Sequence, residues 1–261
     1  MSHSSLLTHA VLTRLANYAP PPDTLDYDLR AAVLLPLFVN RHGGLDIILT
    51  VRALSMRRHA GEVALPGGGV EPEDKTMVDT ALREAYEEIG LEPNQQTVLC
   101  CLRPFFSRHL TLVTPVVSLV HSTGADADLP FVPRLAKQEV SAVFTVPLDR
   151  VLSKRGWEYN DIEWFGRPWR IHRFHGPHRE DEDAPVIWGL TGQVLIHAAK
   201  VAYGYHHPHE EIPQVIREHR MPLEVEEWAE GLDPNEDWEV RFLEALRQGG
   251  IAEPRRLSSR M

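Results

Sequence analysis

One run of the chain, residues 69–91, combines an apolar stripe with clustered carboxylates and reads GVEPEDKTMVDTALREAYEEIGL. Glu84, Glu87 and Glu88 have i, i+3, i+4 spacing, which on a helix places all three within an arc of about 100°. The opposite face is apolar at the same helical period, with Val78, Ala81, Leu82, Ala85 and Ile89. The run therefore predicts a helix from about Met77 to Gly90 with a core side and an acidic side.

The acidic side has two interpretations. Most charge runs are simply solvated helix faces. Like charges at this spacing repel one another and weaken a helix, so a bound cation would relieve them, and oxygen ligands of this kind suit Mg²⁺ or Mn²⁺. Pro66-Gly67-Gly68-Gly69 precedes the helix and forms a loop whose backbone can approach a ligand closely. That loop, together with Arg83 and the stop at Gly90, favours the metal site.

This run resembles the signature of the Nudix hydrolases, G-x5-E-x7-R-E-U-x-E-E-x-G-U, where U is an aliphatic residue. The matching positions are Gly69, Arg83, Glu84, Glu87, Glu88, Gly90 and Leu91. Two positions depart: Lys75 stands where the first glutamate is expected, and Ala85 stands at the aliphatic position. Loss of one carboxylate could weaken metal binding. One branch of the family tolerates this loss and carries acidic residues earlier in the loop, as Glu71 and Asp74 are here.

A second pattern lies directly upstream, where residues 48–69 read ILTVRALSMRRHAGEVALPGGG. It resembles L-L-T-x-R-S-x-x-L-R-x-H-x-G-E-V-x-F-P-G-G, which marks the coenzyme A diphosphatases within the Nudix family. The matches are Arg52, Arg57, His59, Gly61, Glu62, Val63, Pro66, Gly67 and Gly68, and Ala53, Met56 and Leu65 are uncharged departures. The resemblance implies hydrolysis of a pyrophosphate bond with Mg²⁺ or Mn²⁺ as cofactor.

Site roles follow from this resemblance together with the chemistry of the residues. Glu87 and Glu88 are expected to bind the metal directly, and Glu84 is a third ligand or the base. Gly68 is placed at the metal and substrate sites. Arg83 is expected to orient a glutamate through a charge-assisted hydrogen bond rather than to touch substrate, with an ordinary surface ion pair as the alternative.

A more distant acidic residue also enters the expected site. Glu139 precedes a strand-like run, and it is expected to complete the metal site or act as the base, against the alternative of a plain surface glutamate. Glu62, just ahead of the glycine loop, is a further candidate for a metal or water contact.

Arg52, Arg57, Arg58 and His59 form a local basic patch. Coenzyme A carries two phosphorylated regions, and arginine binds phosphate bidentately, so these residues are expected to bind substrate. The alternative is a solvated basic face at a strand end. The predicted reaction yields 3′,5′-ADP and (acyl-)4′-phosphopantetheine from coenzyme A or acyl-CoA. Two alternatives stay open: a Nudix hydrolase of another nucleoside diphosphate derivative, such as NADH or ADP-ribose, and a non-catalytic acyl-CoA-binding sensor.

The composition limits the kinds of partner that we expect the chain to bind. The net charge of −10 argues against an extended nucleic-acid surface, and no apolar run is long enough to cross a membrane. Adjacent Cys100 and Cys101 are poor disulfide partners, which favours a reducing compartment. Ser259-Arg260-Met261 resembles the Ser-Lys-Leu peroxisomal address and suggests a peroxisomal import receptor as a partner. A cytoplasmic or mitochondrial enzyme is the rival, and a homo-oligomer stays open.

The expected fold is an α/β/α sandwich with a mixed sheet, as the resemblance implies, with a short helical C-terminal extension. Residues 1–27 form an N-terminal helix or arm, residues 28–207 the Nudix domain, and residues 208–261 the acidic helical extension. The N-terminal helix could pack on the domain or act as a targeting peptide. Strands are expected at residues 31–40, 46–52, 97–102, 110–121, 140–146, 162–165 and 169–174, and Thr191 is expected to cap a helix from about Gly192 to Tyr203.

Overall fold

A computed structural model describes residues 3–23, 27–121, 129–153, 156–164, 167–175 and 185–204. The predicted C-terminal extension at residues 208–261 and the tripeptide Ser259-Arg260-Met261 lie outside the described residues.

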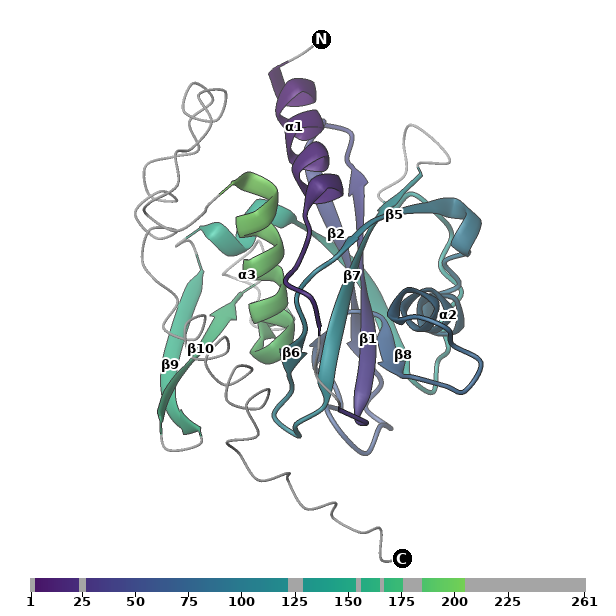
Figure 1. The fold of residues 1–261 in the computed structure, drawn as a ribbon, viewed down its shortest axis with the longest axis vertical. Helices are drawn as coiled ribbons and strands as arrows, with labels where there is room; N and C mark the ends of the chain where they lie inside the picture. Colours follow the sequence, from purple (N-terminus) through teal and green to yellow (C-terminus); the bar gives the residue numbers. More distant parts are fainter. Residues whose placement is uncertain are drawn as a thin grey trace, which may run out of the picture.

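A mixed sheet forms the centre of the molecule (Figure 1). Its main path runs β3–β2–β1–β7–β5, while β4 and β6 add to β1 and β7, and β8 extends the β2 side. β1 runs parallel to β7, and the other pairs are antiparallel. The strands are β1 (Arg30–Val39), β2 (Leu45–Arg52), β3 (Val63–Ala64), β4 (Gly67–Gly69), β5 (Gln96–Cys101), β6 (Phe105–Phe106), β7 (Leu112–Val120) and β8 (Val140–Pro147).

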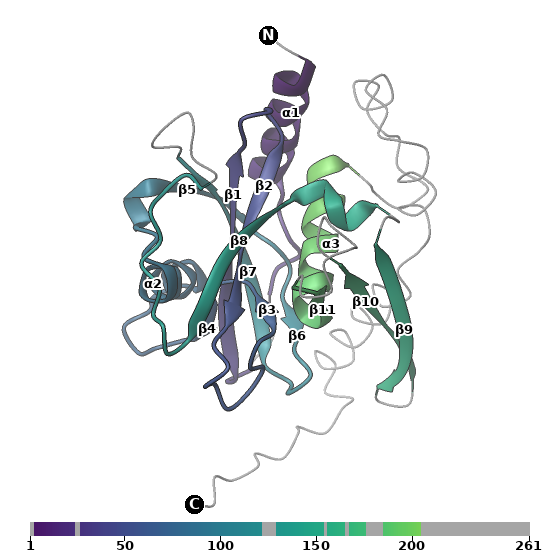
Figure 2. The same ribbon diagram turned by 180° about the vertical axis from the view of Figure 1, so that it is seen from behind.

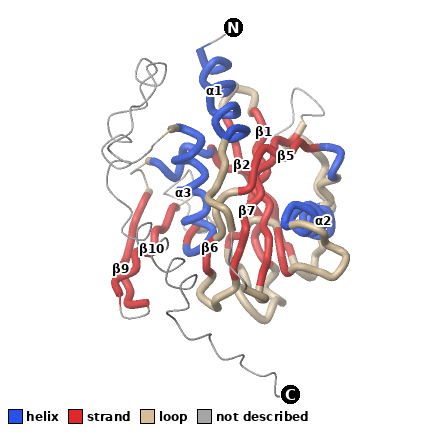
Figure 3. The backbone as a smooth tube through the Cα atoms, viewed as in Figure 1, coloured by secondary structure: helices blue, strands red, loops and turns tan. Residues whose placement is uncertain are grey.

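Helices cover both faces of this sheet (Figures 1 and 3). Helix α2 (Met77–Ile89) lies on one face, and helices α1 (His3–Asn17) and α3 (Gly189–Tyr203) lie on the other. Each face has its own apolar core, one with Ala81, Ala85 and Ile89 of α2, the other with Val11 and Leu15 of α1. The predicted α/β/α sandwich is confirmed.

Helix α2 forms as its apolar period predicts. Thr76 caps the start, where its hydroxyl accepts a hydrogen bond from the backbone N–H of Asp79. Gly90 ends the helix in the left-handed conformation at φ 73° and donates its N–H back to the last turn. The three apolar residues that face the sheet are fully buried, so the helix is fixed in rotation. Glu84 and Glu88 are then turned toward the glycine loop, and Glu87 toward solvent.

A smaller three-stranded sheet lies on the α3 side (Figure 2). It contains β9 (Trp157–Trp164), β10 (Arg167–Phe174) and β11 (Ile187–Trp188), and β9 pairs with β10 as an antiparallel hairpin, as expected. Two 3₁₀ turns, η1 (Pro93–Gln95) and η2 (Leu148–Leu152), complete the described elements.

The expected cap of α3 is wrong. The helix starts at Gly189, with Trp188 at the cap position, so Thr191 lies inside the first turn. Its hydroxyl donates instead to the carbonyl of Val63 in β3, at 3.2 Å. The Thr191 hydroxyl, which was expected to cap the helix, is therefore bonded to a backbone carbonyl of the sheet. None of the described helices is both long and apolar enough to cross a bilayer.

Candidate active site

The glycine loop lies directly against the carboxylates of α2. β4 pairs antiparallel with β1, with Gly68 opposite Ala32. A Cβ added to Gly67 would lie 2.4 Å from the carbonyl oxygen of Ala32, and one added to Gly68 would lie 2.3 Å from Oε1 of Glu84. Any larger side chain at either position would displace the backbone or the carboxylate, so the loop needs glycine here.

Glu84 and Glu88 are the two carboxylates closest to this loop. Glu88 is only 3% exposed, and its Oε2 accepts the N–H of Gly67 at 3.3 Å. Burial raises the pKa of Glu88 to about 7, and the charges of Glu84 and Glu139 add to the rise, while the Gly67 N–H and the nearby Arg52 oppose it. Burial also raises the pKa of Glu84. A cation would reverse this cost, because it favours the ionised forms.

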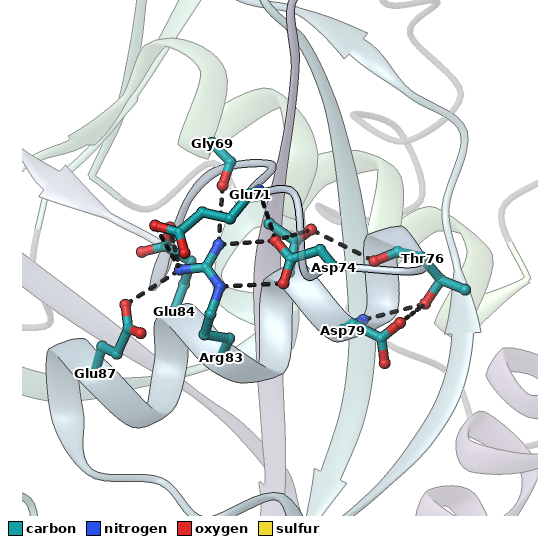
Figure 4. A network of polar contacts seen from close by, with 9 residues as sticks. Gly69, Glu71, Asp74, Thr76, Asp79, Arg83, Glu84 and Glu87 are labelled. Atoms are coloured by element: carbon teal, nitrogen blue, oxygen red, sulfur yellow. Dashed lines mark hydrogen bonds and ion pairs between the residues drawn. The ribbon is translucent and has the colours of Figure 1, made fainter.

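Arg83 lies at the centre of the acidic face (Figure 4). It donates Nε and Nη2 to the two oxygens of Asp74 at 3.1 and 2.9 Å, and Nη2 also to the carbonyl of Gly69 at 3.0 Å. Nη1 donates to Glu84 and to Glu87, each at 3.1 Å. A guanidinium has five N–H donors, and these contacts use all of them. Arg83 is therefore fully engaged in holding protein groups and has no N–H left for a phosphate.

Asp74 is itself held from several sides (Figure 4). Its Oδ2 accepts the backbone N–H of Glu71 and the hydroxyl of Thr80, each at 2.9 Å. The side chain is 4% exposed, and the hydrogen bonds from Arg83 hold the pKa of this carboxyl well below its usual range. Glu71, in contrast, is 57% exposed and 3.8 Å from Arg83. Of these two residues, Asp74 forms the close, hydrogen-bonded ion pair with Arg83, and Glu71 forms only a long one.

Glu139 comes to the site from the turn just before β8. Its charge raises the pKa of both Glu84 and Glu88, after the larger effect of burial. The turn that carries it is hydrogen-bonded on two sides: Ala136 N–H donates to the carbonyl of Glu88 at 2.9 Å, and Ala53 N–H donates to the carbonyl of Glu139 at 2.8 Å. The structure thus places Glu139 near enough for its charge to act on Glu84 and Glu88.

The basic patch divides into two parts. Arg52 ends β2 beside Glu88, and its buried Nε has no hydrogen-bond partner in the described part of the chain. Arg57, Arg58 and His59 lie in the exposed loop that joins β2 to β3.

His59 within this loop has a constrained geometry. It adopts φ 57°, a left-handed conformation that is uncommon for a residue with a side chain, and its Nδ1 lies 2.9 Å from Oε2 of Glu62. Its ring meets the edge of His109, with the centroids 5.8 Å apart. His109 belongs to the turn between β6 and β7, and no sequence pattern pointed to it.

The donor set fits Mg²⁺ or Mn²⁺ in kind. The groups around the glycine loop are carboxylate and backbone oxygens, which are the ligands these ions prefer. The glycine positions keep the space beside Glu84 free of side chains. Across the ranges that the structure describes, no three His, Cys, Asp or Glu side chains already converge as a complete ligand group. Glu87, which was expected to be a direct ligand, is 54% exposed and turned toward Arg83.

A comparison with protein families identifies the domain that carries these residues. The model of the Nudix domain matches residues 28–165, which include β1, the glycine loop, all of α2 and Glu139. The chain belongs to the Nudix family. The Nudix helix is α2, and the sheet that carries it is the family's mixed sheet.

Two relatives of the chain are Nudix hydrolases by name. "Nudix hydrolase 15, mitochondrial" from Arabidopsis thaliana is 42% identical over 174 residues, covering 67% of this chain but 59% of its own length. The chain thus spans less than two thirds of that relative. "Uncharacterized Nudix hydrolase NudL" from Photorhabdus laumondii subsp. laumondii is 36% identical and is covered over 87% of its length. Among solved structures, an Ap4A hydrolase from C. elegans matches 46% of the chain with 20% identity and a TM-score of 0.37.

Proposed function

We propose that this Nudix site hydrolyses the pyrophosphate bond of coenzyme A or an acyl-CoA. The products are 3′,5′-ADP and 4′-phosphopantetheine or its acyl derivative, and the cofactor is Mg²⁺ or Mn²⁺. The observation that carries the proposal is the backbone contact between the basic loop and the turn that carries Glu139. Ala53, at the start of the loop with Arg57 and Arg58, donates its N–H to the carbonyl of Glu139 at 2.8 Å.

The proposed roles follow from burial and contacts. Glu84 and Glu88 hold the metal beside Gly68, whose missing side chain leaves room for it. When bound, the ion lowers the pKa of attacking water and neutralises charge on the phosphate oxygens. Glu139 accepts the water proton or adds a ligand. Glu87 binds the metal once its hydrogen bond with Arg83 is broken, or it attracts the metal through the negative charge that it adds to the acidic side of α2.

The basic residues are proposed to bind the phosphates. Arg52 has an unpartnered Nε next to Glu88, so a phosphate oxygen near the metal would satisfy it. Arg57 and Arg58 are exposed and make no ion pair within the described residues, which leaves both free for an outer phosphate group. His59, oriented by Glu62, adds a ring nitrogen on the same loop.

The test is hydrolysis of free coenzyme A with excess Mg²⁺ and, separately, Mn²⁺, with products identified by mass spectrometry. A Glu87→Gln, Glu88→Gln double variant serves as the inactive control. Release of 3′,5′-ADP and 4′-phosphopantetheine by the wild type, and not by this variant, supports the proposal. Tight coenzyme A binding without turnover would favour an acyl-CoA sensor. Absence of both would favour another nucleoside diphosphate derivative, such as NADH or ADP-ribose.

The compartment remains a prediction. The resemblance of Ser259-Arg260-Met261 to a peroxisomal address supports a peroxisomal enzyme that uses an import receptor. A mitochondrial location is the alternative, since an Arabidopsis relative carries that word in its name. Fluorescence microscopy of the full chain, with and without Arg260→Ala, separates the two, because only a peroxisomal pattern should depend on this residue.

A further inference from the structure

Two histidines from separate loops are in contact. His59 lies in the loop that joins β2 to β3, and His109 lies in the turn of residues 107–111 that joins β6 to β7. The edge of one ring meets the other, with the centroids 5.8 Å apart. Neither the Nudix signature nor the motif upstream of it includes His109, and the proposed function gives it no role.

Both loops leave the end of the sheet that carries the glycine loop. β2 is antiparallel to β1 and β7 is parallel to it, so β2 ends and β7 begins near the start of β1. Gly67–Gly69 pair with residues 31–33, close to the same start of β1. Figure 1 draws this end of the sheet at the bottom. The two rings are therefore at the same end of the sheet as Gly68 and the Glu84 carboxylate beside it.

We infer that Arg108 and His109, together with the loop at Arg57, Arg58 and His59, form a subsite for a phosphate monoester of the substrate. This group is separate from the pyrophosphate that is cleaved, and in coenzyme A it is the 3′-phosphate. A phosphate monoester carries a charge of about −1.5 to −2 at pH 7. The inference rests on the proposed function, because it specifies which part of that substrate the β6–β7 turn binds.

The backbone of both loops adopts an uncommon conformation at this contact. Among the residues that the structure describes, His59 at φ 57° and Leu110 at φ 60° are the two non-glycine residues with positive φ. Such residues are uncommon, and they cluster at binding sites, where the surrounding contacts hold them in place. One of the two belongs to the ring pair, and the other directly follows His109 in the chain. The backbone thus helps to fix where both rings lie.

The β6–β7 turn is closed by hydrogen bonds of its own. Ser107 donates its N–H to the carbonyl of Thr111, and Leu110 donates its N–H to the carbonyl of Ser107, each at 2.9 Å. The Ser107 hydroxyl accepts the N–H of Thr111 at 3.0 Å, and the Tyr27 hydroxyl donates to the Leu110 carbonyl. The two residues at the tip are exposed on this fixed frame. A frame that is already ordered loses less conformational entropy when a ligand binds.

The side chains at the contact suit an anion. Arg57, Arg58 and Arg108 are exposed, and none of the three forms an ion pair in the part of the chain that the structure describes. Nδ1 of His59 lies 2.9 Å from Oε2 of Glu62, so Nε2 is the ring nitrogen that is left for a ligand. Guanidinium groups bind phosphate through paired N–H donors, and an imidazole adds one donor more. A phosphate at this contact would be bound from two loops at once.

The experiment compares the hydrolysis of coenzyme A with that of dephospho-coenzyme A, which lacks the 3′-phosphate, by the full chain with Mg²⁺. We expect the Arg108→Ala, His109→Ala double variant to raise KM for coenzyme A by about tenfold or more, because charge-assisted hydrogen bonds to the phosphate are lost. KM for dephospho-coenzyme A, and kcat for both substrates, should stay within about twofold of wild type.

The chain offers a matched control in the same dipeptide elsewhere. Arg41 and His42 are exposed in the turn between β1 and β2, at the opposite end of the sheet. Arg41→Ala, His42→Ala removes the same groups, yet it should leave KM for both substrates within about twofold of wild type, because salt screens distant charges. His109→Phe keeps a ring against His59 but removes the nitrogens, so it should still raise KM for coenzyme A, by about threefold.

Two outcomes of the kinetic comparison would overturn the subsite. An unchanged KM for coenzyme A in the Arg108→Ala, His109→Ala variant would show that the turn binds no part of the substrate. An equal rise in KM for both substrates would show that the turn only supports the site as a whole.

Nucleotide binding provides a measurement that needs no turnover. By isothermal titration calorimetry, the wild type should bind 3′,5′-ADP about tenfold or more tightly than 5′-AMP, and the double variant should bind both alike. This result in a protein that does not hydrolyse coenzyme A would refute the proposed reaction and support the subsite. Hydrolysis of coenzyme A with equal binding of the two nucleotides by the wild type would refute the subsite alone.

Discussion

Gly68 and Gly69 are neighbours in β4, yet only Gly69 has room for a methyl group. A Cβ at Gly68 would meet the Glu84 carboxylate at 2.3 Å, whereas one at Gly69 would meet nothing within 4 Å. We expect Gly68→Ala to displace Glu84 and lower Mn²⁺ affinity and turnover by about tenfold or more, comparable to the removal of a ligand-orienting group. Gly69→Ala is the matched control. Similar Mn²⁺ titration curves for the two variants would contradict this view of the loop.

The buried Glu88 predicts how the stability of the metal-free protein depends on pH. Its pKa of about 7 in the folded state lies above the ordinary value, so the folded protein binds this proton more tightly. The contribution of this group to stability is therefore fully present below the ordinary pKa of a glutamate and is lost as pH rises through about 7. Glu88→Gln removes this loss, and we expect it to raise the free energy of unfolding at pH 8 by on the order of 1–3 kcal/mol.

The measurement for Glu88 is urea denaturation in a chelator at pH 5 and at pH 8. Glu87→Gln is the control, because it removes a carboxylate from the same helix at a site that is 54% exposed. If Glu88→Gln and wild type lose stability equally between the two pH values, the buried carboxylate is not the cause.

At the scale of elements, the end of α2 and the turn that carries Glu139 are in contact at Gly90. A Cβ at Gly90, at φ 73°, would lie 2.8 Å from Cβ of Arg134, while one at Gly189, at φ 60°, would meet nothing within 4 Å. In both alanine variants the free energy of unfolding should fall by about 1 kcal/mol, because alanine disfavours the left-handed backbone conformation. Only Gly90→Ala should also reduce turnover, since it moves the turn. Equal turnover in both variants would show that the turn is not held there.

An element could be predicted well when the residues that specify it lie within it, and poorly when it depends on contacts with distant parts of the chain. Helix α2 is specified locally, by its apolar period, Thr76 and Gly90, and its bounds were predicted nearly to the residue. Helix α3 was misplaced at its start, because the Thr191 hydroxyl binds a carbonyl more than a hundred residues away. The short strands β3, β4 and β6 carry no period of their own and exist through pairing with β2, β1 and β7.

At the scale of the whole molecule, α1 is part of the core on the α3 side. Leu15 is fully buried, and Arg14 of the same helix donates to the carbonyl of Ala202 in α3 at 3.0 Å. We expect Leu15→Ala to lower the free energy of unfolding by about 2–5 kcal/mol, and Leu6→Ala, at a site 47% exposed, to lower it by less than about 1 kcal/mol. Urea denaturation provides the measurement. No effect of Leu15→Ala would favour a detachable N-terminal segment, as in a targeting peptide.

The site as a whole could be predicted only in part. The carboxylates of α2 follow from helical spacing, and Glu139 was proposed from its place before a strand, but its approach to Glu88 requires the turn at Ala136. The sequence did not distinguish Glu71 from Asp74. In the fold, Asp74 is buried and hydrogen-bonded to Arg83, whereas Glu71 is exposed and 3.8 Å from it. His109 reaches His59 through a turn that no motif marks.

The pairing of Asp74 with Arg83 also limits how this chain can change in length. Between the two lie a tight turn and two turns of helix, and each added or deleted residue in α2 would rotate Arg83 by about 100° away from its partner. Insertions and deletions should therefore be excluded from residues 75–82, whereas the exposed turn between β1 and β2, at Arg41 and His42, should tolerate them. A library of single-residue insertions, selected for Mn²⁺ binding, would show which positions tolerate an added residue.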